Sequence, residues 1–321
     1  MPTTRVAAAL AAALLTAGCT LQEAPHADST AVNVAAQKAA RIWNPETYKA
    51  PAVDSTPDDE FETSAFRGLA IVTKTRDSLP DYVGSSLTCV SCHLDEGRRP
   101  NAAPLVGVVA RYPKYVDRSD AVVTIEDRIN YCLTRSLAGT KLPNDSREMA
   151  DIIAYLMVIS RGVPVGEHVK GEGLPPMPTN IAHDSSRGHP LYRDNCARCH
   201  GNNGQGIGVV PALWGAKSYS IGASMARVGR AAEFIRANMP FDHPGSLTDQ
   251  QAYDIATYIN SMTRPDLPGK ENDWPQGGAP ADVPYETKGH LAGWAPRVIP
   301  RATNLAGAIV PPPSSVVNRR R

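Results

Sequence analysis

The sequence lacks several features that would point to common classes of protein. Its 321 residues carry 33 basic and 32 acidic side chains, and a formal net charge of +1 gives no reason to expect a nucleic-acid partner. Aromatic side chains are scarce, with four tryptophans and four phenylalanines, so much of any large apolar core must come from another source. The apolar run from Val6 to Leu15 is too short to span a bilayer.

That apolar run belongs to an export signal. A basic residue precedes it, and small residues follow it up to Cys19. The letters LTAGC resemble a bacterial lipobox, in which Cys19 becomes the lipidated first residue, although Thr16 stands where leucine is usual. Ordinary cleavage just before the cysteine is the alternative. Residues 1–19 therefore predict a periplasmic protein, either free or anchored to a membrane as a lipoprotein.

The six cysteines form two pairs and two single residues, a spacing that argues against a disulfide framework. Both pairs belong to the motif C-x-x-C-H, the attachment signature of c-type haem, in which two thiols bond to the porphyrin and the histidine ligates the iron. A four-cysteine zinc site is disfavoured because zinc-binding pairs seldom lie so far apart, and a thioredoxin-like pair needs no adjacent histidine. We predict two covalently bound haem c groups, attached through Cys89, Cys92, His93, Cys196, Cys199 and His200.

The chain repeats itself around these motifs. His93 and His200 lie 107 residues apart, and Pro104 and Pro211 keep the same separation. In small c-type cytochromes the carbonyl of such a proline commonly accepts a hydrogen bond from the proximal imidazole. The repeat predicts a mainly α-helical protein of two small cytochrome c-like modules, each wrapped round a covalently bound haem.

Periodicity and composition divide the chain further. Apolar residues at i, i+3, i+4 and i+7 predict amphipathic helices over residues 149–156 and 252–259, one near the end of each half. Proline and glycine mark a linker and a proline-rich tail, which we expect to be extended and partly packed over the modules. The predicted segments are the signal at 1–19, a tether with a short helix around residues 32–43 at 20–55, module 1 at 56–163, the linker at 164–186, module 2 at 187–264, and the tail at 265–321.

A haem iron with a proximal histidine has a sixth position, which methionine usually fills in electron carriers. Met239 lies just before the last predicted helix, where such modules present this ligand, whereas the other methionines of that half resemble helix-packing residues. Cys132 lies 107 residues before Met239, so the repeat places this cysteine in the equivalent position. An inert buried thiol is the alternative, but ferric haem favours a thiolate donor. The predicted axial pairs are His93 with Cys132 and His200 with Met239.

The two predicted ligand sets differ electronically. A thiolate lowers the reduction potential of the iron, whereas a thioether raises it. Electrons would therefore run from the first haem to the second, which suits an enzyme better than a carrier with two equal sites.

Arginines surround the cysteine. Arg118, Arg128 and Arg135 flank it in sequence, and the repeat aligns Arg128 with Ile235 of the second half. Guanidinium groups beside a thiolate would lower its pKa and offer forked donors to a small oxyanion. A solvated helix face is the alternative, because several carboxylates lie nearby in the sequence.

Several stretches together resemble the dihaem thiosulfate dehydrogenases: YVGSSLTCVSCHLDEGRRPNAAPLVGV, IEDRINYCLTRSLAGTKLP, CARCHGNNGQG, PALWG and NMPF, within residues 65–265. The resemblance implies that the first haem is catalytic and that two thiosulfates are joined to tetrathionate with release of two electrons, reversibly in some members. It places Cys132 as the axial thiolate and Arg118, Arg128 and Ser136 on substrate-contacting positions. Some relatives carry a lysine beside the methionine that competes as ligand, but Asn238 stands there in this chain, so no such ligand switch is expected.

The resemblance also implies a soluble redox acceptor, such as a small cytochrome c. Two other functions stay open on the residues alone. A non-enzymatic dihaem electron carrier explains the haem motifs and Met239 but leaves Cys132 without a role. A haem subunit of the Sox sulfur-oxidation complex also uses cysteine-ligated haem, but it acts on a carrier protein together with a partner subunit.

Overall fold

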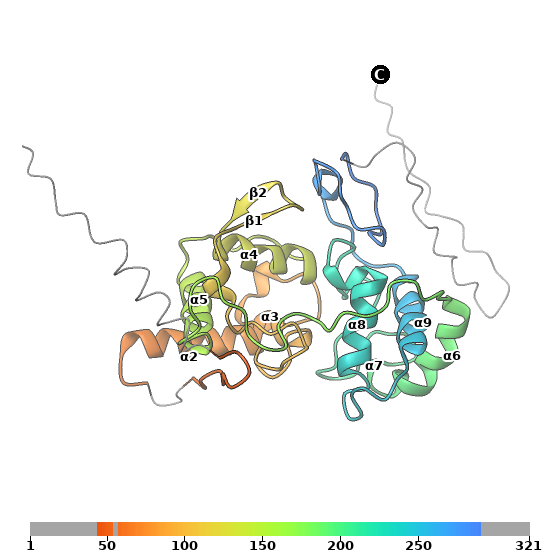
Figure 1. Ribbon diagram of the computed structural model, residues 1–321, viewed down its shortest axis with the longest axis horizontal. Helices are drawn as coiled ribbons and strands as arrows, with labels where there is room; N and C mark the ends of the chain where they lie inside the picture. Colours follow the sequence, from red (N-terminus) through yellow and green to blue (C-terminus); the bar gives the residue numbers. More distant parts are fainter. Residues whose placement is uncertain (1–43, 54–56, 290–321) are drawn as a thin grey trace, which may run out of the picture. The chain divides into compact units, whose positions relative to one another are not determined.

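The structure is a computed structural model that describes residues 44–53 and 57–289. The export signal and the predicted tether helix lie outside the described residues. The mainly α-helical prediction is confirmed, because the described residues hold eight α-helices and one pair of short strands (Figure 1), and none of these helices is long and apolar enough to cross a membrane. The helices are α2 (Glu60–Thr73), α3 (Thr75–Ser78), α4 (Ile125–Tyr131), α5 (Arg147–Ile159), α6 (Ser185–Asn195), α7 (Ala197–His200), α8 (Val228–Asn238) and α9 (Asp249–Asn260), and the antiparallel strands are β1 (Lys114–Val116) and β2 (Ala121–Val123). Short 3-10 turns lie at Pro80–Tyr82, Cys89–Ser91, Val108–Arg111, Ser224–Ala226 and Lys270–Asn272, and a π-helical turn lies at Cys132–Ser136.

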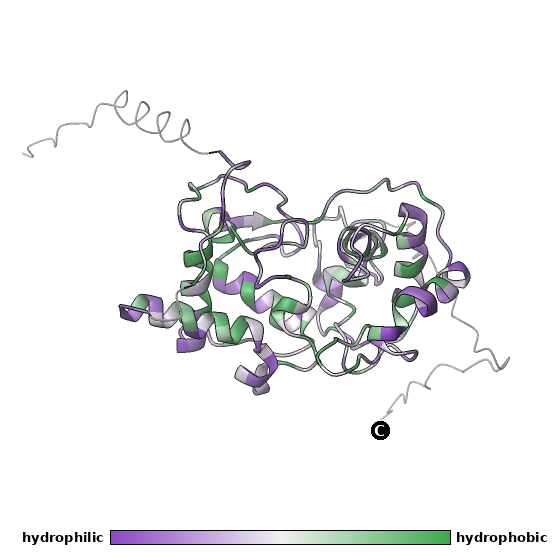
Figure 2. Cartoon of the chain, turned by 90° about the horizontal axis from the view of Figure 1, so that it is seen from below, coloured by the Kyte–Doolittle hydropathy of each residue, from purple (hydrophilic) through white to green (hydrophobic). Residues whose placement is uncertain are grey.

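The two predicted amphipathic helices are α5 and α9. Each begins at a hydroxyl residue whose side chain accepts a hydrogen bond from the third residue of the helix: Ser146 caps α5, and Thr248 forms a capping box with Gln251 at the start of α9. In Figure 2 apolar and polar residues alternate along the helices, as expected for elements with one buried face.

In module 1, α2 crosses α5 at a glycine. A Cβ atom at Gly68 would lie 2.0 Å from the backbone oxygen of Asp151, so only glycine allows this approach. Beside the crossing, the Arg67 guanidinium donates two hydrogen bonds of 2.8 Å to the buried Asp151 carboxylate, and Ser64 donates a third of 2.6 Å. This forked pair fixes the angle of the two helices that enclose the first C-x-x-C-H loop.

Module 2 uses the same device. A Cβ atom at Gly188 of α6 would lie 2.0 Å from the backbone oxygen of Asp254 of α9, and Arg187 donates two hydrogen bonds of 2.9 and 2.8 Å to the Asp254 carboxylate. The repeat thus extends to the first helix of each module. Sequence analysis did not identify it there, because these glycines lie 120 residues apart and not 107.

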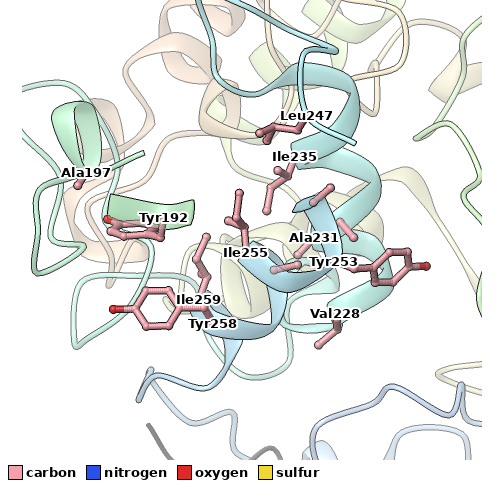
Figure 3. Close-up of a cluster of buried hydrophobic side chains, with 13 residues drawn as sticks. Tyr192, Ala197, Val228, Ala231, Ile235, Leu247, Tyr253, Ile255, Tyr258 and Ile259 are labelled. Atoms are coloured by element: carbon pink, nitrogen blue, oxygen red, sulfur yellow. The ribbon is translucent and has the colours of Figure 1, made fainter. Parts of the chain in front are cut away.

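The core of module 2 lies between α6, α8 and α9 (Figure 3). Ile235 of α8 and Ile255 of α9 belong to one buried cluster with Tyr192 of α6. The Tyr192 ring packs 5.0 Å from Trp214 and 5.4 Å from Tyr258, centroid to centroid. These rings place much of the scarce aromatic surface beside the second C-x-x-C-H loop.

Residues 265–289, which we call the strap, follow module 2 and form the described part of the predicted tail. Trp274, Val283 and Tyr285 of the strap form a small buried cluster of their own. Asp282 accepts hydrogen bonds from Arg227 Nε at 2.7 Å and from the backbone N–H of Gly229 at 3.0 Å, which ties the strap to the start of α8. The strap is therefore a folded part of the protein.

Replacing Gly188 with alanine should destabilise module 2, because the new methyl group must displace the α9 backbone. Overpacking of this kind costs about 2 kcal/mol, and we expect a lower midpoint in thermal unfolding followed by circular dichroism. Gly229→Ala is the matched control, since its Cβ would meet only the far end of the Asp282 side chain, at 3.0 Å. Equal midpoints for the two variants would contradict a tight crossing.

Candidate active site

Module 1 encloses a cavity that contains both thiols of the first C-x-x-C-H motif. The cavity has a volume of about 680 Å³, open solvent at its mouth included, and Cys89, Cys92, His93 and Cys132 all line it. The remaining lining is mostly aliphatic: Val72, Leu79, Leu87, Leu105, Ile129, Leu133, Leu137, Ile152 and Leu156. An apolar cavity with two thiols and a histidine suits a porphyrin attached by thioether bonds.

The described cysteines also fit haem better than zinc or a redox pair. None of them forms a disulfide in the described part of the chain. Nowhere among these residues do three His, Cys, Asp or Glu side chains gather as they do at a metal-ion site. The pairs therefore keep their thiols for attachment of a cofactor.

Backbone carbonyls orient both proximal histidines. His200 Nδ1 donates to the carbonyl of Pro211 at 3.0 Å, as the repeat predicts. His93 Nδ1 donates to Ala103 at 2.5 Å, so the expectation of Pro104 is wrong by one residue. Ala103 lies in the left-handed region, with φ 49°, and this local turn sets its own carbonyl against the ring. In both modules Nε2 stays free to meet an iron.

Cys132 lies where α4 gives way to the π-helical turn. Thr124 caps α4 by accepting from the backbone N–H of Asp127, and the N–H of Cys132 is shared between the carbonyls of Arg128 and Ile129. The turn then carries both Cys132 and Ser136 to the cavity wall. Such π-helical turns often occur at functional sites, because they shift side chains out of regular helical register.

Arg128 is the arginine that contacts the cysteine. Its Nη1 donates to Cys132 Sγ at 3.0 Å. Burial alone would raise the pKa of the Cys132 thiol, as burial raises the pKa of Cys89 to about 11. The charge of Arg128 and the contact with His93 oppose that effect and lower the pKa of Cys132 to about 6. Two thiols in one cavity are thus given opposite protonation preferences by one guanidinium.

The other arginines near the cysteine in sequence point elsewhere. Arg118 and Arg135 both donate to the carboxylate of Asp273, in the strap. Ser136, by contrast, lines the cavity beside Cys132. Sequence analysis missed Asp273, since it lies 138 residues beyond Arg135 and belongs to no motif.

In module 2, Met239 follows the last residue of α8 and adopts an extended conformation. Its side chain packs against the buried cluster that also contacts Cys196 and Trp214. Ile235, which the repeat aligns with Arg128, is buried in that cluster. The neighbouring Asn238 amide donates to the backbone oxygens of Asn101 and Phe234, at 2.9 and 3.3 Å, and so replaces the lysine of some relatives with a structural contact.

Two helical modules that each surround a C-x-x-C-H loop define a dihaem c-type cytochrome, with a cysteine and a methionine at the predicted distal positions. Comparison with known families agrees. The family described as "SoxA/TsdA, cytochrome c domain" matches residues 83–165, and that described as "Cytochrome C oxidase, cbb3-type, subunit III" matches residues 183–259.

Individual relatives extend the match across most of the chain. The thiosulfate dehydrogenase of Psychrobacter arcticus is 40% identical over 74% of this chain and 74% of its own length, and that of Allochromatium vinosum is 39% identical over 67% and 83%. A solved structure of thiosulfate dehydrogenase (TsdBA) from Marichromatium purpuratum, in its as-isolated form, superposes with a TM-score of 0.65 at 34% identity, and the match covers 69% of this chain and half of that chain. The chain belongs to the thiosulfate dehydrogenase family, and its cofactors are two covalently bound haem c groups.

Replacing Arg128 with methionine should lower the reduction potential of the first haem. The variant keeps the apolar stem but removes the charge and the hydrogen bond that draw electron density from Cys132 Sγ, so we expect a fall on the order of 50 mV in a spectroscopic redox titration. The second haem serves as an internal control and should keep its potential. An unchanged first potential would contradict a functional Arg128–Cys132 contact.

Proposed function

We propose that this protein oxidises two thiosulfates to tetrathionate in the periplasm, and that the bond between sulfurs forms at Cys132. The observation that carries the proposal is the Arg128–Cys132 contact inside the cavity of the first C-x-x-C-H motif. The activity named for its relatives, which are 40% and 39% identical to this chain, agrees with it.

The first step joins one thiosulfate to the protein. Its sulfane sulfur bonds to Cys132 Sγ, and the pair loses two electrons, so a thiolate and a dianion become a cysteinyl thiosulfonate with a single negative charge. When bound, the two haems accept these electrons, one each. No proton moves in this step if Cys132 begins as a thiolate, the form that Arg128 favours.

The second step releases the product. A second thiosulfate attacks the sulfane sulfur of the adduct, the bond from that sulfur to Cys132 Sγ breaks, and tetrathionate leaves with two negative charges. The thiolate is regenerated, and no further electrons are exchanged. The same steps run backwards would reduce tetrathionate.

Positive charge is needed because both substrates are dianions. Arg128 lies within hydrogen-bond distance of the sulfur where the new bond forms, and Ser136 offers a hydroxyl from the same cavity wall. We assign Arg118 to the binding of thiosulfate through its guanidinium. Together these groups would offset the repulsion between the two anions as they approach.

The electrons then leave through module 2. With His200 and Met239 as ligands, the second haem would have the higher potential and would pass electrons to a soluble acceptor such as a small cytochrome c. A lipid on Cys19 would hold the enzyme at a membrane surface without changing this route.

A non-enzymatic dihaem carrier is the alternative of a different class. It would need neither a cysteine at a distal position nor a guanidinium bonded to it, so the Arg128–Cys132 contact disfavours it. A Sox-type subunit would act on a carrier protein, and activity of the isolated chain on free thiosulfate separates that function from ours.

Cys132→Met should abolish thiosulfate oxidation while both haems stay attached. The change gives the first module the ligand set predicted for the second, and it removes the sulfur that forms the adduct. We expect loss of at least about a thousandfold in turnover with an artificial acceptor. Haem content by the pyridine haemochrome assay is the control, and near-normal oxidation by the variant would overturn the proposal.

The two haems should also differ in the untreated enzyme. A redox titration followed by electron paramagnetic resonance should resolve one thiolate-ligated haem and one methionine-ligated haem, the first lower in potential by on the order of 100 mV. Two methionine-ligated spectra would support the carrier instead.

A further inference from the structure

We propose that Asp273 of the strap is a positioning residue of the active site, which holds the Arg118 guanidinium in the orientation that binds thiosulfate. The inference rests on the proposed function, in which Arg118 contacts the substrate. The residues concerned lie far apart in sequence, since Asp273 is 155 residues beyond Arg118.

The Asp273 carboxylate is buried, with 6% of its side chain exposed, and it accepts four hydrogen bonds. Oδ2 accepts from Arg118 Nε at 2.9 Å, from Arg135 Nη1 at 2.8 Å and from the Tyr285 hydroxyl at 2.6 Å. Oδ1 accepts from Arg135 Nη2 at 2.6 Å. A carboxylate with this many charged donors keeps one orientation and fixes the groups that bond to it.

Arg118 is held on several sides at once. Its Nη2 donates to the backbone oxygen of Gly222 at 2.8 Å and to the Tyr285 hydroxyl. The Trp274 ring lies 4.7 Å from the guanidinium carbon, and the backbone N–H of Trp274 donates to the Arg118 carbonyl at 2.8 Å. Arg118 Nη1 has no hydrogen-bond partner among the described residues, so this nitrogen is left for a ligand.

The charges of the cluster favour an anion. Two guanidinium groups share one carboxylate, which leaves a surplus of one positive charge in a partly buried place. Burial would raise the pKa of the Asp273 carboxyl, but Arg135 and Arg118 lower it below its usual value, so the carboxylate stays charged. Asp273 therefore orients Arg118 without cancelling its attraction for thiosulfate.

Asp273 also belongs to a segment that could act only as a fastening between parts of the chain. The strap offers a matched control for that possibility. Asp282 ties the same segment to Arg227 and Gly229, and none of its printed partners is Arg118. A purely structural strap would make the two aspartates equivalent.

Asp273→Asn should raise the KM for thiosulfate about tenfold and leave kcat within about twofold, because an amide cannot accept from two guanidiniums and Arg118 loses its fixed orientation. Asp282→Asn should leave both constants within about twofold of wild type. Tyr285→Phe, which removes one donor to the carboxylate and is a milder change, should raise KM about threefold.

A double-mutant cycle tests whether Asp273 acts through Arg118. In an Arg118→Gln background, Asp273→Asn should change KM by less than about twofold. The electron paramagnetic resonance signal of the first haem should stay unchanged in Asp273→Asn, which shows that the effect does not pass through the iron.

Three outcomes would overturn the inference: equal effects of the two aspartate variants, independent effects of Asp273 and Arg118 in the cycle, or an unchanged KM in both Asp273→Asn and Tyr285→Phe. Failure of the wild-type enzyme to oxidise thiosulfate would instead refute the proposed function. The two failures are therefore distinguishable.

Discussion

The close crossing of two helices in each module is the constraint on which the rest of the fold depends. A glycine lets the backbones meet, and an arginine fork on a buried aspartate fixes the angle, at Gly68 with Asp151 and again at Gly188 with Asp254. Each crossing holds the C-x-x-C-H loop that lies between its two helices in sequence. Because the frame is the same twice, differences between the modules reflect what was changed around each haem.

Those changes gather on the distal side. In module 2 the distal segment is a regular helix, α8, which ends at Asn238 and leaves Met239 in an extended conformation against an apolar cluster. In module 1 the equivalent segment continues into a π-helical turn, and Arg128 replaces an apolar residue beside the ligand position. A thioether needs only apolar packing, whereas a buried thiolate needs a cation to offset the cost of its charge.

Sequence patterns predicted what local chemistry requires. The C-x-x-C-H motifs, the amphipathic helices and the alignment of Cys132 with Met239 all depend on short spacings, and the structure places Arg128 on the cysteine sulfur. The carbonyl that meets His93 was missed by one residue, because a left-handed Ala103 redirects the loop. Asp273 could not be predicted, since its partners come from distant segments and only the folded chain brings them together.

The position of Asp273 changes what counts as the catalytic unit. The matched family domains end at residues 165 and 259, and the strap begins after both. Yet Arg118 of module 1 bonds to the strap through Asp273 and to Gly222, which belongs to the loop before α8. The substrate-binding arginine is thus fixed by all three parts of the chain, and module 1 alone would carry the cysteine and Arg128 without a defined place for Arg118. The second module and the strap therefore serve the chemistry at Cys132 in addition to carrying electrons away from it.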